Sequence, residues 1–193
     1  MKFLNIALIA AGLATFAVPV AAQMGGSDSF KFLEAVRKDD APTGIQLLKS
    51  HPTIIDAKDG KGDTALIMVI ARGDPSWTGY LLKNGADPNL SGANGDTPLI
   101  AAVRVGFIEA ARWLVDLGAK VDATNRMGET PLIVAVQQRN AQMVKQLLAA
   151  GANPDVTDAA AGYSARDYAK RDSRSREILK LIEDKKPRPS AAN

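Results

Sequence analysis

The chain has 193 residues, of which 46% are hydrophobic and 23% are charged, and its formal net charge at pH 7 is +3. This composition is that of a globular protein with a packed core, and it excludes an intrinsically disordered chain. The absence of cysteine also excludes a disulfide framework, a cysteine nucleophile and a lipid-modified cysteine.

The first predicted element is an export signal in residues 1–22. Lys2 supplies a positive charge, the stretch FLNIALIAAGLATFAV is apolar, and small residues end the segment at Ala22. We expect cleavage after Ala22, which leaves a mature chain that begins at Gln23 in the periplasm or outside the cell. The alternative is an uncleaved anchor, because residues 3–22 just reach across the roughly 30 Å hydrocarbon core as a helix. No other segment is apolar enough to span a bilayer.

The mature chain is built on a period of 33 residues. Two landmarks keep this spacing in three copies, a threonine and a Gly-Ala dipeptide. The threonines are Thr64, Thr97 and Thr130. The dipeptides are Gly85-Ala86, Gly118-Ala119 and Gly151-Ala152. Two different landmarks at one spacing indicate a tandem array in which every unit is one supersecondary element.

Each copy predicts two short helices followed by an extended loop. A threonine is a good N-cap because its hydroxyl accepts a first-turn N–H, and Pro98 or Pro131 suits the first helical position. Glycines then end the helices, since glycine tolerates a left-handed turn. Arg139 stands where the other copies have Gly73 and Gly106, so we expect strain or a shifted register there. The residues between units, such as ADPNLSGANG, are turn formers that predict a protruding loop.

Weaker copies flank the three strong ones. The upstream copy lacks the Thr-Pro pair, and the downstream copy has Ser164 as its cap with Asp167 placed for a capping box. Atypical terminal units are expected, because they must present a polar outer face. We therefore predict an all-α solenoid domain at residues 23–185, followed by a disordered basic tail at residues 186–193. Its five units are residues 27–58, 59–91, 92–124, 125–157 and 158–185.

The repeated motif resembles the ankyrin repeat, a helix-turn-helix-loop unit with a period of 33 residues. The matching segments are GADPN, GANPD, and TALIMV, TPLIAA and TPLIVA, which begin at Thr64, Thr97 and Thr130. One departure is systematic, because isoleucine replaces the family's histidine at Ile67, Ile100 and Ile133. We expect the hydrogen bonds of that histidine to neighbouring loops to be replaced by packing or to be absent.

Catalytic and cofactor chemistry finds little support in the sequence. His51 is the only histidine, and its place between a predicted helix end and a proline favours a structural role. No cluster of His, Asp and Glu has metal-ligand spacing and no phosphate-binding glycine motif is present, so we expect no metal and no cofactor. Acids recur at equivalent loop positions, where we expect them to point outward in parallel instead of converging on a substrate. They are Asp59, Asp63, Asp96 and Glu129.

The resemblance implies a protein-binding surface, because in ankyrin repeats the partner meets the ends of the first helices and the loop tips on the concave side. The corresponding helix-end residues are Arg37, Lys38, Arg72, Arg104, Val105, Gln137, Gln138 and Arg171, with Phe107 just beyond. The loop tips offer Lys61, Asn94, Arg126 and Met127. Arginines and exposed apolar residues are typical of interfaces, so we expect this surface to bind an acidic patch on a partner protein. The alternative is that the arginines form a solvated face with the usual preference of cations for helix C-termini.

The sequence leaves three functions open. The first is noncatalytic protein binding by a monomer in the exported compartment, as an adaptor, stabiliser or inhibitor. The second is an enzyme with an unrecognised site. The third is adhesion to anionic envelope components, because residues 166–188 carry nine Lys/Arg and only five Asp/Glu. Export and the interspersed acids argue against nucleic acid as a partner.

Overall fold

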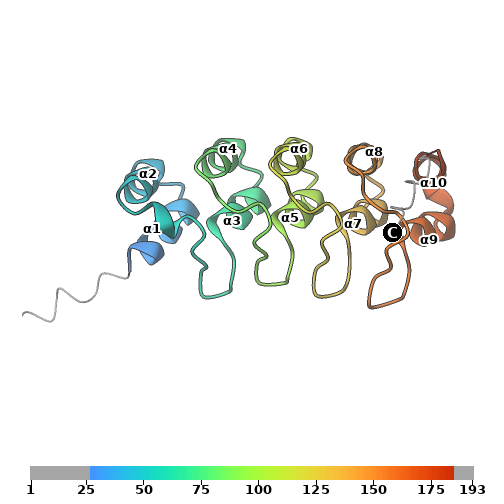
Figure 1. Ribbon diagram of the computed structural model, residues 1–193, viewed down its shortest axis with the longest axis horizontal. Coiled ribbons are helices and arrows are strands. Elements are labelled where there is room, and N and C mark those ends of the chain that lie inside the picture. The colour runs from blue at the N-terminus through green and yellow to red at the C-terminus, as the bar shows by residue number, and fades with distance from the viewer. Residues whose placement is uncertain (1–26, 185–193) are drawn as a thin grey trace, which may run out of the picture.

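The computed structural model describes residues 27–184, so the predicted export signal and basic tail lie outside the described residues. The described chain folds into five helix pairs that lie side by side along one axis (Figure 1). One helix of each pair belongs to a lower row and the other to an upper row, and extended loops hang below both rows (Figure 1). The predicted all-α solenoid of five units is confirmed.

The two rows are made of helices of seven to ten residues. The lower row contains α1 Asp28–Arg37, α3 Ala65–Arg72, α5 Pro98–Arg104, α7 Pro131–Gln137 and α9 Ala165–Arg171. The upper row contains α2 Ala41–Ser50, α4 Pro75–Lys83, α6 Ile108–Asp116, α8 Ala141–Ala149 and α10 Arg176–Glu183. Short 3-10 helices, η2 Pro52–Ile54 and η3 Ser173–Ser175, follow α2 and precede α10. Within residues 27–184, no helix is long and apolar enough to cross a membrane.

The lower-row helices begin as the sequence predicts. The hydroxyls of Thr64, Thr97 and Thr130 accept the backbone N–H three residues ahead at 3.2 to 3.3 Å. Ser164 and Asp167 form the expected capping box at the start of α9. Isolated helices of this length are unstable in water, where about 12 to 15 residues are needed. Packing between neighbouring repeats therefore holds them.

The turns between paired helices use the left-handed region of backbone conformation. Gly73 and Gly106 have φ of 71° and 67°, which costs glycine little. Arg139 takes φ of 55° at the equivalent turn, and Asp39 takes φ of 59° in the first pair. A residue with a side chain is strained there by about 1 kcal/mol or more, so the expected strain at Arg139 is present.

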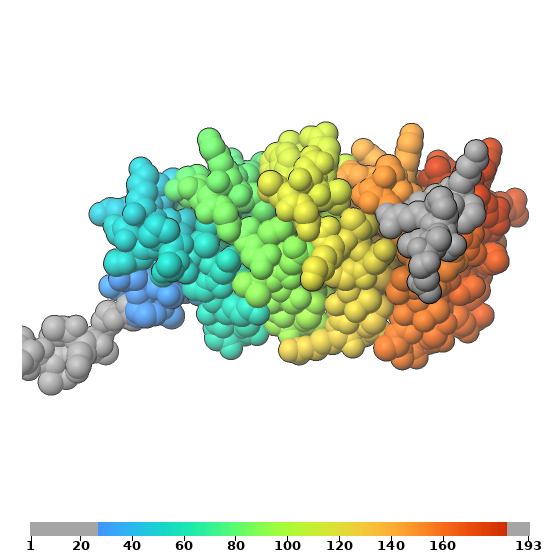
Figure 2. Space-filling view, viewed as in Figure 1, coloured from blue at the N-terminus to red at the C-terminus, as the bar shows by residue number. Residues whose placement is uncertain are grey.

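The hydrophobic core runs along the whole array between the two rows. Leucines from both rows have no exposed surface, including Leu81, Leu99, Leu114, Leu132 and Leu147. The isoleucines that replace the family's histidine, Ile67, Ile100 and Ile133, are also buried. Burial of such a side chain contributes about 2 kcal/mol, so these positions stabilise the stack by packing. The packed repeats form one continuous surface, with the loop tips along its lower edge (Figure 2).

Candidate binding surface

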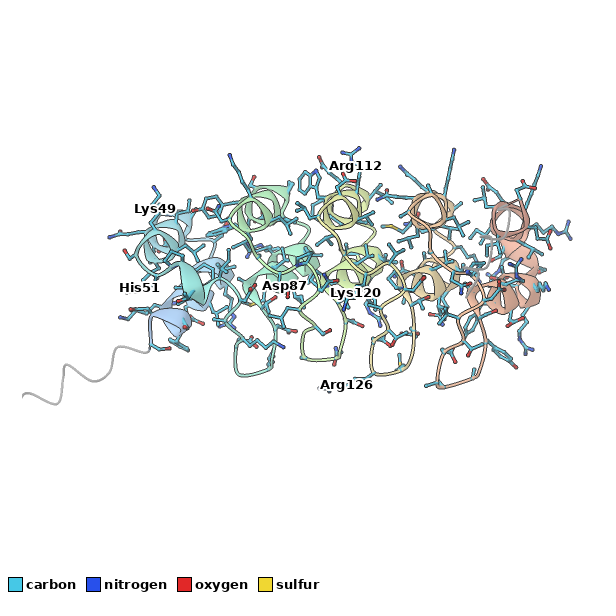
Figure 3. All side chains as sticks on the ribbon, in the orientation of Figure 1. Lys49, His51, Asp87, Arg112, Lys120 and Arg126 are labelled. Carbon is cyan, nitrogen blue, oxygen red and sulfur yellow. The ribbon has the colours of Figure 1, made fainter. Side chains whose placement is uncertain are left out.

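The bases of neighbouring loops are connected by a repeated hydrogen bond. A side-chain oxygen at the base of one loop accepts the backbone N–H of a residue 31 positions later, in the next loop. The pairs are Asp56 with Asp87, Asn89 with Lys120, and Asp122 with Asn153, at 3.0, 2.8 and 2.8 Å. Asp87 and Lys120 lie in neighbouring repeats (Figure 3). These bonds fix the spacing of the loops that carry the predicted contact residues.

Each internal loop tip folds into the same turn. The N–H groups of Gly62, Gly95 and Gly128 donate to the carbonyl oxygen three residues earlier at 2.9 to 3.0 Å. These glycines have φ of 98°, 74° and 75°, which explains why glycine recurs at this position. The turns place the predicted residues at the tips, namely Lys61, Asn94, Arg126 and Met127. Arg126 extends below the helices at the lower edge of the array (Figure 3).

The sequence predicted outward, parallel orientations for four loop acids, Asp59, Asp63, Asp96 and Glu129, and this prediction is wrong. Asp63 Oδ1 accepts the N–H of Ala93 in the next loop at 2.8 Å. Gly92 leaves room for that carboxylate, because a Cβ there would lie 2.3 Å from the same oxygen. The acids turn toward neighbouring repeats because hydrogen-bond donors face them there. Loop-to-loop hydrogen bonds are therefore present without the family's histidine.

Four side chains form a closed network between the third and fourth repeats: Asp96, Arg104, Asn125 and Glu129. Arg104 donates to Asp96 at 2.7 and 3.1 Å and to Glu129 at 3.1 Å. The amide of Asn125 donates to the same two carboxylates at 3.0 and 2.8 Å. The hydrogen bond to Asp96 is the main cause of a raised pKa of Arg104, and the nearby Glu129 adds to it. Burial of the guanidinium acts in the opposite direction. Glu129 is only 7% exposed and Asn125 is also buried, whereas the Arg104 side chain is 37% exposed, so the network runs from the interior to the surface.

The other helix-end arginines of the predicted surface also have partners inside the described chain. Their contacts are Arg37 with Glu34 and Asp59, Arg72 with Asp74 and the carbonyl oxygen of Val36, and Arg171 with the ring of Tyr163. Arg72 donates to these two acceptors at 2.9 Å, and its Nη2 also lies 3.6 Å from a carboxylate oxygen of Asp39. The guanidinium carbon of Arg171 lies 4.4 Å from the ring centroid, a cation–π distance. These arginines therefore connect parts of the array to one another, which sequence spacing alone did not indicate.

Comparison with protein families gives a match over most of the chain. A family model described as ankyrin repeats in three copies matches residues 20–125 and residues 78–158. The chain belongs to the ankyrin repeat family. Ankyrin repeats are protein–protein interaction modules, and proteins of this family are generally noncatalytic. Among curated proteins, none matches the chain.

Two positively charged residues at the ankyrin loop tips have no side-chain partner within the described residues. Among residues 27–184, no ion pair or side-chain hydrogen bond involves the side chain of Lys61 or Arg126, and both residues are exposed. Two apolar side chains are similarly accessible, since Val105 is 47% and Met127 is 50% exposed. Asn94 is exposed at the tip between Lys61 and Arg126. These residues belong to the part of the predicted surface that is exposed and has no ion pair or side-chain hydrogen bond within residues 27–184.

Other predicted contact residues are engaged within the ankyrin array. Gln138 donates to the carbonyl oxygen of Arg104 at 2.9 Å. Lys38 pairs with Glu34 at 3.3 Å. Phe107 is half-buried, with its ring centroid 6.4 Å from that of Trp113. Gln137 is exposed, and its side chain lies beside that of Tyr168. These side chains therefore make contacts within the array, although Lys38, Gln137 and Gln138 remain exposed.

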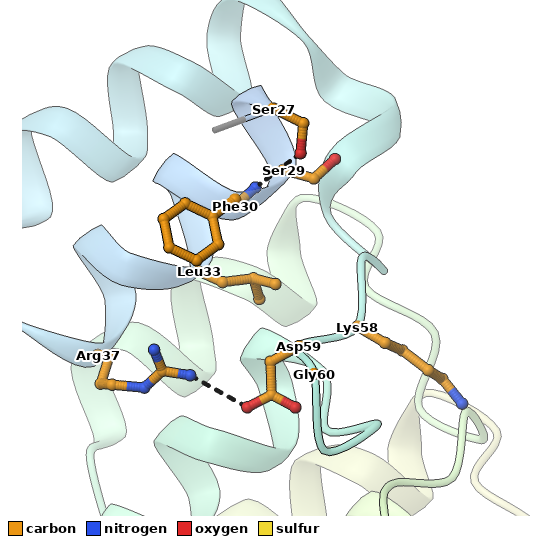
Figure 4. Close-up of a pocket in the computed structure, with 8 residues that line it drawn as sticks. All are labelled: Ser27, Ser29, Phe30, Leu33, Arg37, Lys58, Asp59 and Gly60. Carbon is orange, nitrogen blue, oxygen red and sulfur yellow. Dashed lines mark hydrogen bonds and ion pairs between the residues drawn. The ribbon is translucent and has the colours of Figure 1, made fainter. Parts of the chain in front are cut away.

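A hollow of about 340 Å³ lies between α1 and the first ankyrin loop (Figure 4). Its lining residues are Ser27, Ser29, Phe30, Leu33, Arg37, Lys58, Asp59 and Gly60. Ser29 holds the position of Asp63, Asp96 and Glu129 in the following repeats, counted from the turn residues Asp39, Gly73, Gly106 and Arg139, and Phe30 beside it is 57% exposed. Arg37 reaches Asp59 along one wall at 3.0 Å (Figure 4). The first junction thus lacks the acid that connects the later loops.

The described part of the ankyrin domain offers little for metal chemistry. Between Ser27 and Asp184, no group of three or more His, Cys, Asp or Glu is placed to hold a metal ion. His51 lies at the C-terminal end of α2, where its Nε2 is 3.3 Å from a carboxylate oxygen of Asp28. That contact fits the structural role that the sequence indicated for His51.

Proposed function

We propose that this ankyrin repeat protein is a noncatalytic module that binds a partner protein in the exported compartment, as an adaptor, stabiliser or inhibitor. Binding uses the concave face and the loop tips. The observation that carries the proposal is the accessibility of Lys61, Arg126, Val105 and Met127 in a region whose other arginines are paired internally. An interface needs such accessible groups, because a side chain already paired must lose its partner before it can bind.

The accessible groups favour a partner surface that is both acidic and partly apolar. Exposed Met and Arg residues are enriched in interfaces, and a few such residues carry most of the binding energy. Lys61 and Arg126 lie at the edge of the array, so they contribute mainly to the association rate and to its salt dependence. Val105 and Met127 contribute affinity by burying apolar surface.

The test is capture of one identified partner by the mature chain and by two charge variants. Arg72 and Arg104 are unsuitable targets because their replacement would break contacts between repeats. The Lys61→Glu, Arg126→Glu variant changes only tip charges and should lose the partner while its unfolding transition stays unchanged. The control variant Lys49→Glu, Arg112→Glu makes the same charge change on the upper row (Figure 3) and should retain the partner. Equal binding by both variants would refute the proposed surface.

We also propose that the protein is exported as a monomer after cleavage behind Ala22. The apolar segment that precedes this position and its small-residue ending support the proposal. Intact-mass measurement of the protein from the exported fraction should give a chain that begins at Gln23. A chain that retains residues 3–22 in the membrane fraction would instead support the anchor. Light scattering of the purified protein should give the mass of one chain.

A further inference from the structure

Two Asn-Gly pairs occur in the described chain, and their surroundings differ. Asn94-Gly95 lies at the tip of an internal loop, whereas Asn84-Gly85 follows the last residue of α4. An asparagine that precedes glycine is open to attack by the next backbone nitrogen, because glycine has no Cβ to obstruct the approach. The structure therefore places the same reactive sequence in two settings that can be compared.

We propose that Asn94 is a site of spontaneous deamidation. The backbone nitrogen of Gly95 attacks Cγ of Asn94, a C–N bond forms, and the side-chain amide leaves as ammonia together with the proton of that nitrogen. Water then opens the cyclic imide at either carbonyl carbon. One opening gives aspartate, and the other gives isoaspartate, in which the main chain continues through the β-carboxyl group. The net reaction consumes one water and releases one ammonia.

The surroundings of Asn94 leave its side chain accessible to this attack. The residue is exposed, and no hydrogen bond or ion pair in the described part of the chain involves its side chain. The N–H of Gly95 donates to the carbonyl oxygen of Gly92 at 3.0 Å, within the tip turn. Attack therefore requires this turn to open, without any change in a helix. Exposed turns open far more readily than packed helices do.

Asn84 is held in a different way. Its side-chain amide donates to the carbonyl oxygen of Tyr80 at 2.7 Å. Its backbone N–H also donates to Tyr80, and the N–H of Gly85 donates to Leu82 at 3.2 Å. Attack by the nitrogen of Gly85 requires the C-terminal turn of α4 to unwind. The folded protein should thus deamidate at Asn94 long before it does so at Asn84.

The reaction changes the surface at a loop tip. It adds one negative charge between the tips that carry Lys61 and Arg126, and the isoaspartate form lengthens the main chain within the turn. If the partner is acidic, which rests on the function proposed above, the added charge weakens its attraction to the tips. Deamidation would then lower the affinity of the surface as the protein ages.

The test is peptide mapping by mass spectrometry of the purified folded protein during incubation at mildly alkaline pH. The peptide containing Asn94 should gain the mass of an amide-to-acid conversion and separate into aspartate and isoaspartate forms, while the peptide containing Asn84 stays unchanged. Asn94→Gln should remove the signal, because cyclisation through the longer side chain is much slower. In urea, where the fold no longer distinguishes the two sites, their rates should become similar.

This measurement needs no partner, so its outcome is independent of the proposed binding function. Conversion of Asn84 as fast as Asn94 in the folded protein would overturn the inference. So would the absence of conversion at Asn94 over a period in which the urea-unfolded chain converts. Progressive accumulation of the two product forms at Asn94 alone would support it.

Discussion

The junction between the third and fourth repeats and the junction between the first and second use equivalent sequence positions with different chemistry. In the later junction, Glu129 is buried and shares Arg104 with a second carboxylate. In the first junction, Ser29 stands in place of the acid, Phe30 beside it is 57% exposed, and Arg37 pairs with Asp59 beside an open hollow. Removal of Glu129 leaves a buried amide and a partly exposed guanidinium each short of an acceptor, whereas a single ion pair with a half-exposed cation contributes little. Repeats of one family therefore differ in how strongly they are joined.

The largest loss of stability should come from a substitution that fills the space between the loops of the fourth and fifth repeats. A Cβ at Gly128 would lie 2.5 Å from the backbone nitrogen of Ala159, whereas a Cβ at Gly62, in the same turn position, would find no atom closer than 3.6 Å. Gly128→Ala should lower the free energy of unfolding by about 3 kcal/mol, from left-handed strain plus overpacking. Gly62→Ala should lower it by about 1 kcal/mol, from strain alone. Urea unfolding of both variants measures the difference, and equal losses would contradict it.

Removal of a network acid should have the next largest effect. Glu129→Ala leaves Arg104 and the buried Asn125 each without one of the two carboxylates that accept their hydrogen bonds. We expect a loss of about 2 kcal/mol in the free energy of unfolding. The matched control is Glu109→Ala on the exposed side of α6, which should change stability by less than about 0.5 kcal/mol. If both variants unfold at the same urea concentration, the network contributes nothing beyond its surface charge.

Lowering the pH should reduce stability more weakly, through Asp172 in the last repeat. The backbone N–H of Arg174 and then the side chain of Arg139 lower the pKa of Asp172 from 3.8 to about 2. Because the folded pKa lies below the unfolded one, ionised Asp172 favours the folded state above pH 3.8, and this contribution is lost as the pH falls through about 2. Arg139→Gln should raise the pKa of Asp172 and reduce this pH dependence. Carboxyl NMR titration measures the pKa directly, and an unchanged value would count against the pairing.

The smallest effect should come from the exposed end of the first junction. Phe30→Ala removes a side chain that is 57% exposed, so the free energy of unfolding should change by no more than about 0.5 kcal/mol. A loss comparable with that of Glu129→Ala would show that the first junction is packed as firmly as the later one. Thermal unfolding of the two variants under identical conditions makes this comparison.

The fold could be predicted because its signals are local and recur with the period. The threonine caps and the left-handed position of Arg139 follow from neighbouring residues or from alignment of one repeat on the next. The network could not be predicted, because Arg104 meets acids 8 and 25 residues away and its side-chain conformation decides which. Gly92 is one signal in the sequence that was overlooked. The other loops have a polar residue at this turn position, and glycine there leaves room for the carboxylate of Asp63. The accessible residues Lys61 and Arg126 were identified from family positions, and their role stays a prediction.

The hydrogen bonds at the loop bases have a consequence for how such an array changes length in evolution. Each acceptor bonds the N–H that lies 31 residues later, in the following loop. After loss of residues 92–124, the residue 31 positions after Asn89 would be Asn153, which would take over the hydrogen bond of Lys120. As far as this hydrogen bond is concerned, whole units are interchangeable, and a unit can be duplicated or deleted without further substitutions. The same deletion would remove Arg104 and leave Glu129 buried without its cation. The third and fourth units are therefore expected to be inherited together.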